Sequence, residues 1–239
     1  MFEFRKKLKY NLDVIDIRDV TPLVRRVTFK GDLFATALPC QPSQWLKLFL
    51  PSGGSQVSRA YTIRRHYPQS GNVDIDFVRH DHGPAGRWAE QAQFGDQIGC
   101  SALRGGFQPQ EDAEWMLLAA DETGTPAVMS ILESLSPGDR ALVVLEAETM
   151  TELQALDSLA AVNCEWFFRD EHPAGSNLLL QGIDRLQLPS GVGQFWIAGE
   201  AQCVNEVRDY LTEACSIPRR LVRSKGYWMR GVADHRDRD

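Results

Sequence analysis

The hydrophobic pattern of this chain changes at one point, and that change constrains the fold more than any other feature. From Lys9 to Arg104, strand-length apolar segments follow one another between Pro, Gly and Ser turns, which is typical of a small antiparallel barrel. After the polar connector Gln108–Glu114, strand-like runs alternate with helix-like runs, which predicts a parallel sheet with right-handed crossovers. We therefore predict two domains: an antiparallel Greek-key β-barrel over residues 1–110, followed by an α/β parallel-sheet domain over residues 111–239.

The positions of the individual elements follow from the same pattern. In the barrel we predict strands at Tyr10–Ile17, Leu23–Phe29, Trp45–Leu50, Arg59–Arg65, Val73–Arg79 and Gln97–Leu103. In the α/β domain we predict strands at Trp115–Ala120, Ala141–Glu146, Cys164–Phe168, Phe195–Ala198 and Arg220–Lys225. Helices are predicted at Pro126–Leu135, Met150–Ala160 and Ala201–Ala214.

Composition narrows the class of protein. Hydrophobic residues make up 43% of the 239 residues and charged residues 24%, as in a globular protein. No apolar run is long enough for a signal peptide or a membrane span, so we expect a cytoplasmic monomer without membrane insertion. The net charge of -6 disfavours nucleic acid as a partner, and the five scattered cysteines form no Cys-x-x-Cys pair that would indicate a metal centre.

The stretch Ser58–Arg64 concentrates cationic, aromatic and hydroxyl side chains in one predicted strand. Because side chains alternate along a strand, Arg59, Tyr61 and Ile63 are expected on one face, and Thr62 and Arg64 on the other. Such a strand could offer a phenol for stacking, a hydroxyl for a ring nitrogen and a guanidinium for a phosphate, which are the contacts that a flavin dinucleotide needs. The alternative is an ordinary half-buried strand with its arginines in solvent.

A second feature downstream favours the flavin interpretation. His82–Ala89 is a Gly/Pro turn that opens a helix pattern, and a helix N-terminus with free amides can bind a pyrophosphate. Two histidines, His80 and His82, precede this helix. With no third partner in the sequence, they are better interpreted as strand-end residues beside the dinucleotide than as metal ligands.

These two motifs, with Asp76–His80, Asp121–Thr123, Trp196–Glu200 and Gly226–Trp228, resemble the siderophore-interacting proteins, which are FAD-dependent ferric-siderophore reductases of the ferredoxin reductase superfamily. The resemblance covers nearly the whole chain. It implies that residues 1–110 bind FAD and that residues 111–239 form an NAD(P)H-binding-like domain.

The resemblance also implies roles for individual residues. Tyr61 would stack on the isoalloxazine ring, with Thr62 near flavin N5, while Arg64 would contact the pyrophosphate; Arg59 either joins this site or makes a structural ion pair. Gly86 stands where the family often has Ser, so a hydroxyl contact would be lost and the backbone amide kept. The residues expected at the cofactors are Arg59, Tyr61, Thr62, Ile63, Arg64, His80, His82, Gly83, Pro84, Ala85, Gly86, Trp88, Asp121, Thr123, Ala198, Glu200, Tyr227 and Trp228. Trp88 could line the adenine site or pack in the core.

The first turn of the α/β domain, Asp121–Glu122–Thr123, has carboxylates where a nicotinamide-binding domain usually has glycines that let the backbone approach the pyrophosphate. At the next strand end, Glu146 could accept ribose hydroxyls. Arg169, after the third strand, could instead meet a 2′-phosphate. The sequence thus leaves NADH and NADPH open as electron donors.

We therefore predict an NAD(P)H-dependent flavoprotein that reduces ferric siderophores and releases ferrous iron in the cytoplasm. Two alternatives stay open: a flavin reductase coupled to a ferredoxin, and an iron-chelate binding protein without reductase activity. An acidic protein must attract an anionic chelate locally. The candidate cations, each of which could instead be a solvated surface charge, are Lys47, Arg65, Arg104, Lys225 and Arg230.

Overall fold

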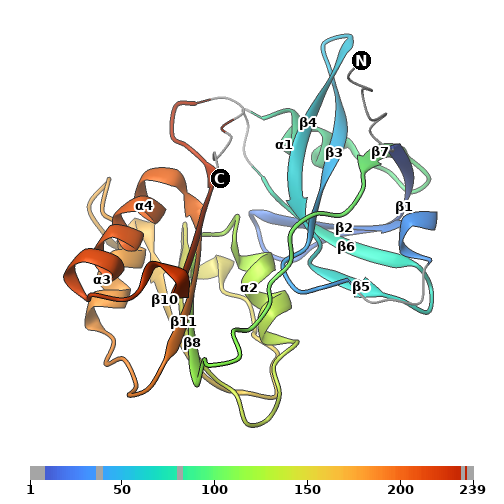
Figure 1. Cartoon of the computed structure of the whole chain (residues 1–239). Helices are drawn as coiled ribbons and strands as arrows, with labels where there is room; N and C mark the ends of the chain where they lie inside the picture. Colours follow the sequence, from blue (N-terminus) through green and yellow to red (C-terminus); the bar gives the residue numbers. More distant parts are fainter. Residues whose placement is uncertain (1–8, 36–39, 80–82, 233–234, 236–239) are drawn as a thin grey trace, which may run out of the picture. The chain divides into compact units, whose positions relative to one another are not determined.

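The structure is a computed structural model that describes residues 9–35, 40–79, 83–232 and 235. The chain folds as two compact units, residues 1–107 and 108–239 (Figure 1). Among the described residues, no helix is both long and apolar enough to cross a bilayer.

Unit 1 is built on one seven-stranded antiparallel sheet with the strand order β4-β3-β7-β1-β2-β6-β5. The strands are β1 (Lys9–Asp19), β2 (Val24–Lys30), β3 (Trp45–Ser52), β4 (Ser55–Thr62), β5 (Arg65–Tyr67), β6 (Asn72–Val78) and β7 (Gln97–Ser101). Only two residues, Ile63 and Arg64, join the edge strands β4 and β5, so the sheet must curl until its edges approach each other. The predicted antiparallel barrel is thereby confirmed as a curled, barrel-like sheet.

The core of unit 1 fills the inside of this curl. Inward positions that alternate along the strands are fully buried, as Leu12 and Val14 of β1 and Ile75 and Phe77 of β6 illustrate. One helix, α1 (Pro84–Gln91), contributes Ala85 and Ala89 to the same core. The helix is thus anchored to the sheet by its small apolar face.

Unit 2 has a five-stranded parallel sheet with the order β10-β9-β8-β11-β12. Its strands are β8 (Trp115–Ala120), β9 (Arg140–Ala147), β10 (Ala161–Phe168), β11 (Gly193–Glu200) and β12 (Val222–Trp228), and its helices are α2 (Thr125–Leu132), α3 (Leu178–Arg185) and α4 (Ala201–Asp209). Helices α3 and α4 pack on the sheet face that carries Trp115, Leu117 and Ala119, and α2 lies on the other face (Figure 1). The strand order reverses direction between β8 and β11, so ligands are expected at the carboxyl ends of these two strands. The predicted parallel-sheet α/β fold is confirmed.

Four details differ from the sequence-based expectation. The predicted strand Arg59–Arg65 is interrupted at Ile63 and Arg64 and forms parts of β4 and β5. The predicted helix Met150–Ala160 is wrong: one 3-10 turn, Met150–Glu152, is followed by irregular chain in which the Ser158 hydroxyl donates to the Leu132 carbonyl at the end of α2. Helix α3 was not predicted. The last predicted helix changes after Asp209 into a π-helical turn, Tyr210–Ala214.

Candidate functional sites

The two motifs that the sequence offers for a flavin are connected in unit 1 by Phe77, an aromatic residue of strand β6. The ring of Phe77 in β6 lies 4.5 Å from that of Tyr61 in β4 and 5.6 Å from that of Trp88 in α1, centroid to centroid. Trp88 also stacks on Phe29 of β2 at 6.0 Å. Of the two roles considered for Trp88, core packing is therefore the one with contacts in unit 1.

The residues that follow Tyr61 are more buried than an alternating strand would make them. Thr62, Ile63 and Arg64 are 8%, 3% and 6% exposed. The interruption between β4 and β5 is the reason: Ile63 N-H donates to the Gln44 carbonyl and Arg64 N-H to the Asp74 carbonyl, so these two residues are held by different neighbours. Arg64 consequently places a buried guanidinium at the junction of the two edge strands, and Ile63 belongs to the apolar core.

Gly83 is the N-cap residue of helix α1. Pro84 occupies the first helical position, and among the described residues no side chain caps this end. Arg87 N-H donates to the Gly83 carbonyl, whereas the amides of Ala85 and Gly86 belong to the first-turn groups for which a helix has no internal acceptor. The expected residues His80 and His82 lie outside the described part of the chain.

The remaining cationic candidates of unit 1 are distributed over several elements. The Arg59 guanidinium donates to the neighbouring Ser58 carbonyl at 2.9 Å. Lys47 is half-buried in β3, and Arg65 in β5 lies close enough to the Tyr67 phenol to oppose the rise in the pKa of Tyr67 that burial and Asp74 cause. Arg104 is exposed, with its guanidinium 5.6 Å from the centre of the Trp45 ring.

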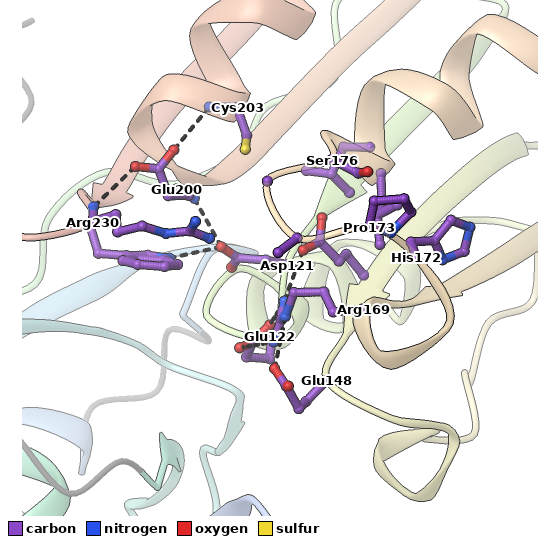
Figure 2. Close-up of a pocket in the computed structure, with 16 residues that line it drawn as sticks. Asp121, Glu122, Glu148, Arg169, His172, Pro173, Ser176, Glu200, Cys203 and Arg230 are labelled. Atoms are coloured by element: carbon purple, nitrogen blue, oxygen red, sulfur yellow. Dashed lines mark hydrogen bonds and ion pairs between the residues drawn. The ribbon is translucent and has the colours of Figure 1, made fainter.

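Unit 2 contains a pocket of about 430 Å³ at the carboxyl ends of its parallel strands (Figure 2). We call it the carboxylate pocket because its described lining includes five carboxylates and only two guanidiniums. The charged residues of this lining are Asp121, Glu122, Glu146, Glu148, Arg169, Glu200 and Arg230. Every strand of the sheet ends in or is followed by at least one of them, since all five strands end at this edge.

Asp121 lies at the centre of this edge and bonds to groups from three other segments. Its Oδ1 accepts from the Thr123 hydroxyl and from the amides of Thr123 and Gly124, at 2.5, 2.8 and 3.3 Å. Its Oδ2 accepts from Glu200 N-H at 2.9 Å and from Trp228 Nε1 at 2.8 Å. Burial, and secondly the charge of Glu122, raise the pKa of Asp121 to about 6 against these donors. The carboxylate thus occupies the turn amides that a Gly-rich turn would offer to a pyrophosphate.

Glu200 connects the end of β11 to two other segments. Its Oε2 caps α4 by accepting from Gln202 N-H at 2.7 Å and Cys203 N-H at 3.0 Å, and its Oε1 accepts from Arg230 N-H at 3.1 Å. Burial alone would raise the pKa of Glu200, but these backbone donors hold it below the ordinary value. Glu200, expected from the sequence at the cofactors, is thus the N-cap residue of α4.

Arg169, directly after β10, is held by three glutamates (Figure 2). Its Nη1 lies 2.9 Å from both Glu122 Oε2 and Glu146 Oε1, its Nη2 lies 2.6 Å from Glu122 Oε1, and its Nε lies 2.9 Å from Glu148 Oε2. Burial opposes the charge of Arg169, yet these carboxylates raise its pKa overall. Burial also raises the pKa of Glu146, which the Arg169 bond partly offsets.

The pocket gathers some of the expected residues and adds others. Asp121, Glu200, Trp228 and Arg230 line it, whereas Thr123, Ala198, Lys225 and Tyr227 are placed beside it in the same turn and strands. Sequence reasoning missed the loop 172–176, the end of α3 that follows it, and Cys203. The strand-end rule could have identified this loop, since it follows β10.

The described residues contain no group of three or more His, Cys, Asp or Glu side chains that could hold a metal ion. Iron enters the chemistry considered below only as a substrate.

Comparison with known proteins gives a consistent result in both units. Residues 52–106 match the siderophore-interacting FAD-binding domain, and residues 113–231 match the siderophore-interacting protein model. The chain is 33% identical to the NADPH-dependent ferric-chelate reductase of Escherichia coli, over 74% of this chain and 68% of that protein. It is 29% identical to the ferric vibriobactin reductase of Vibrio cholerae, over 92% of this chain and 89% of that protein.

A solved structure supports the same relationship. The siderophore utilization protein from T. fusca superimposes with a TM-score of 0.84 at 29% identity, covering 96% of this chain and 95% of that one. Fold, family matches and relatives agree over both units, and the chain belongs to the siderophore-interacting protein family.

Proposed function

We propose that this protein is an FAD-dependent reductase that takes electrons from NADH or NADPH and reduces ferric siderophores or related ferric chelates, so that ferrous iron is released. The family membership supports the FAD-binding role of unit 1. The names of the relatives, two of them reductases of ferric chelates, support the substrate class.

The observation that carries the proposal is the proximity in unit 1 of the groups expected to bind a flavin. A buried guanidinium, Arg64, lies at the strand junction shortly after Tyr61, and the Phe77 ring contacts both Tyr61 and Trp88 of helix α1, whose first turn follows Gly83. A guanidinium and a helix N-terminus are both suited to a pyrophosphate, so these residues fit FAD better than FMN, which lacks that group. When bound, FAD would supply the conversion of a two-electron hydride donor into single-electron steps.

The residues of the chain would bind and orient this cofactor. Arg64 and the amides of Ala85 and Gly86 would hold the pyrophosphate, and the half-buried Tyr61 would present its ring to the flavin from a position fixed by Phe77. Thr62, which is 8% exposed and pairs with Trp45 of β3, would direct a hydrogen bond toward the flavin ring. Burial of the Tyr61 phenol raises its pKa, so the ring stays neutral at physiological pH.

The carboxylate pocket of unit 2 would hold the nicotinamide donor. It lies where the strand order reverses, which is the usual ligand site of an open parallel sheet. Its acceptor-rich lining suits the hydroxyl groups of a ribose. Because Asp121 occupies the turn amides itself, we expect the donor to bind with modest affinity and to leave readily after it has been oxidised.

One-electron reduction is sufficient to release the metal. Hard oxygen ligands bind ferric iron more tightly than ferrous iron, so reduction weakens the chelate without a protein ligand to the metal. The chain carries a net charge of -6, and an anionic chelate therefore needs a local group of cations. Lys47, Arg65, Lys225 and Arg230 remain candidates, while Arg104 also packs on Trp45.

The proposal is tested on the purified full chain. We expect bound FAD by mass spectrometry, bleaching of its absorbance by anaerobic NADH or NADPH, and rapid return of the absorbance on addition of a ferric catecholate, with ferrous iron trapped by a ferrous-specific chelator. An Arg64→Ala variant supplies the control with weakened flavin binding.

The alternatives give different results. A protein that binds the chelate but leaves the reduced flavin unoxidised would be a binding protein and would contradict the proposal. Bleaching by a reduced ferredoxin, with neither nicotinamide effective, would favour the ferredoxin-coupled reductase instead.

A further inference from the structure

Arg169 is the residue after β10 that could meet the 2′-phosphate of NADPH, and the structure shows that its donors are used by the protein. Four hydrogen bonds to Glu122, Glu146 and Glu148 engage all three guanidinium nitrogens. A guanidinium has five N-H groups, so at most one remains, which is insufficient for a two-pronged contact with a phosphate. Arg169 is present in the pocket, but its guanidinium is already hydrogen-bonded to carboxylates of the protein.

A 2′-phosphate at this position would be surrounded by negative charge. A phosphate monoester carries about -1.5 to -2 charges at pH 7, and it would have to displace at least one glutamate from Arg169 in order to bind. The displaced carboxylate would then lie beside the phosphate, because Glu122 and Glu146 are anchored at the ends of neighbouring strands. Placing like charges together in this way weakens the binding of a dinucleotide that carries a 2′-phosphate relative to one that lacks it.

A ribose without a 2′-phosphate can instead use the same carboxylates as hydrogen-bond acceptors. Its hydroxyl groups donate, and an ionised carboxylate can accept about four hydrogen bonds through its two oxygens. The bond from Arg169 to Glu146 uses Oε1, so the carboxylate retains acceptor capacity. Glu146 is 8% exposed, and the bond from Arg169 holds it in place as an acceptor at the end of β9.

We propose that Arg169 and its three glutamates make the donor site select NADH, whose ribose is unmodified, over NADPH, with Glu146 as the hydroxyl acceptor. This inference rests on the proposed function and concerns the donor class only. We expect NADH to be favoured in the second-order rate constant of flavin reduction by about tenfold or more, as is usual when like charges oppose a ligand.

The test measures binding as well as rate. Calorimetry on the full-length protein at fixed ionic strength compares 5′-AMP with adenosine 2′,5′-bisphosphate, which differs by the 2′-phosphate alone. The wild type should bind 5′-AMP more tightly. Glu148→Gln removes the charge of the most exposed of the three carboxylates and weakens its hold on Arg169, so the bisphosphate should gain about tenfold relative to 5′-AMP. The double variant Glu122→Gln, Glu148→Gln should gain more.

Glu171→Gln is the matched control. Glu171 lies in the same 3-10 turn as Arg169, is exposed, and is not part of the pocket lining, so the same charge change should leave the preference unaltered. A wild type that prefers the bisphosphate, or a Glu148→Gln variant in which both ligands gain equally, would overturn the inference. So would the absence of binding by both probes.

The proposed function is judged separately from this inference. Reoxidation of the photoreduced flavoprotein by a ferric catecholate needs no nicotinamide. A protein that passes this assay and prefers NADPH would retain its function and lose only the inferred donor preference.

Discussion

Trp228 Nε1 donates to Asp121 Oδ2 at 2.8 Å, and this bond joins the ends of β12 and β8 across the intervening strand β11. Glu200 N-H, at the end of β11, donates to the same oxygen at 2.9 Å. One buried carboxylate thus fixes the relative positions of three strand ends at the edge where the carboxylate pocket opens.

The pH dependence of stability should report on this carboxylate. The pKa of Asp121 rises on folding from 3.8 to about 6, so between these values the folded state binds more protons than the unfolded state, and stability falls as the pH rises. The fall should amount to about 3 kcal/mol and level off above pH 6. Urea unfolding between pH 4 and 8 measures it, and Asp121→Asn should flatten this part of the profile.

Trp228→Phe should extend the fall of stability with pH to higher pH values. Removing the indole donor takes away one of the bonds that favour the ionised form of Asp121, so its pKa should rise further and the decline should continue above pH 6. The expected cost near neutral pH is about 1 to 3 kcal/mol. Trp166→Phe, in β10, is the control for loss of a tryptophan in the same sheet; equal profiles for the two variants would contradict the assignment.

Removing the charge of Arg169 should destabilise the protein in a pH-dependent way. In Arg169→Met the carboxylates of Glu122 and Glu146 lose their shared partner, and we expect a loss of about 2 kcal/mol or more at pH 8. At pH 5 the loss should shrink, because the pKa of Glu146 is already raised by burial and would rise further. The control Arg208→Met breaks a surface pair with Asp209 and should cost about 0 to 1 kcal/mol at either pH.

Gly199→Ala should disrupt the site through the backbone. Gly199 has φ of +152°, and a Cβ there would lie 2.7 Å from Asp121 Oδ2. Strain and the displaced carboxylate should together cost about 1 to 3 kcal/mol, visible as a lower urea midpoint. Gly138→Ala meets no atom within 4 Å and should leave the midpoint unchanged or slightly raised.

Arg64→Ala should weaken FAD retention by tens-fold or more, since a charge-assisted phosphate contact contributes about 1.5 to 3 kcal/mol. Flavin absorbance after exhaustive dialysis measures this. Arg104→Ala, an exposed arginine of the same unit, should retain the flavin as the wild type does. If Arg64→Ala retains it equally well, Arg64 does not contact the pyrophosphate.

Reduction of an anionic ferric chelate should slow as ionic strength rises, because an acidic protein captures it only through local cations. A neutral chelate should respond far less. Neutralising Arg65 and Lys225 together, which do not line the carboxylate pocket, should raise the Michaelis constant for the anionic chelate and leave flavin reduction by nicotinamide intact. A parallel loss of flavin reduction would assign these two cations to the donor site instead.

Much of the architecture could be predicted locally. The strand predicted at Trp115–Ala120 has the bounds that the structure shows, because six consecutive apolar residues between polar segments are typical of a strand buried on both faces of a parallel sheet. The helix predicted at Met150–Ala160 is wrong because this segment buries no continuous apolar face. Its composition favours a helix, but the Ser158 bond to Leu132 and the exposure of Leu153 and Leu159 leave no apolar face for a helix to bury.

The sequence by itself determined the two-unit architecture, the flavin motif and the acidic first turn, since these depend on patterns within a few neighbouring residues. Tertiary structure alone decided which charges meet. Arg169 is paired with Glu122, 47 positions away, and with Glu146, 23 positions away, because parallel strands end at one common edge. Local patterning specifies which strands form, but the pairing of side chains at their ends depends on strand order, which neighbouring residues do not encode.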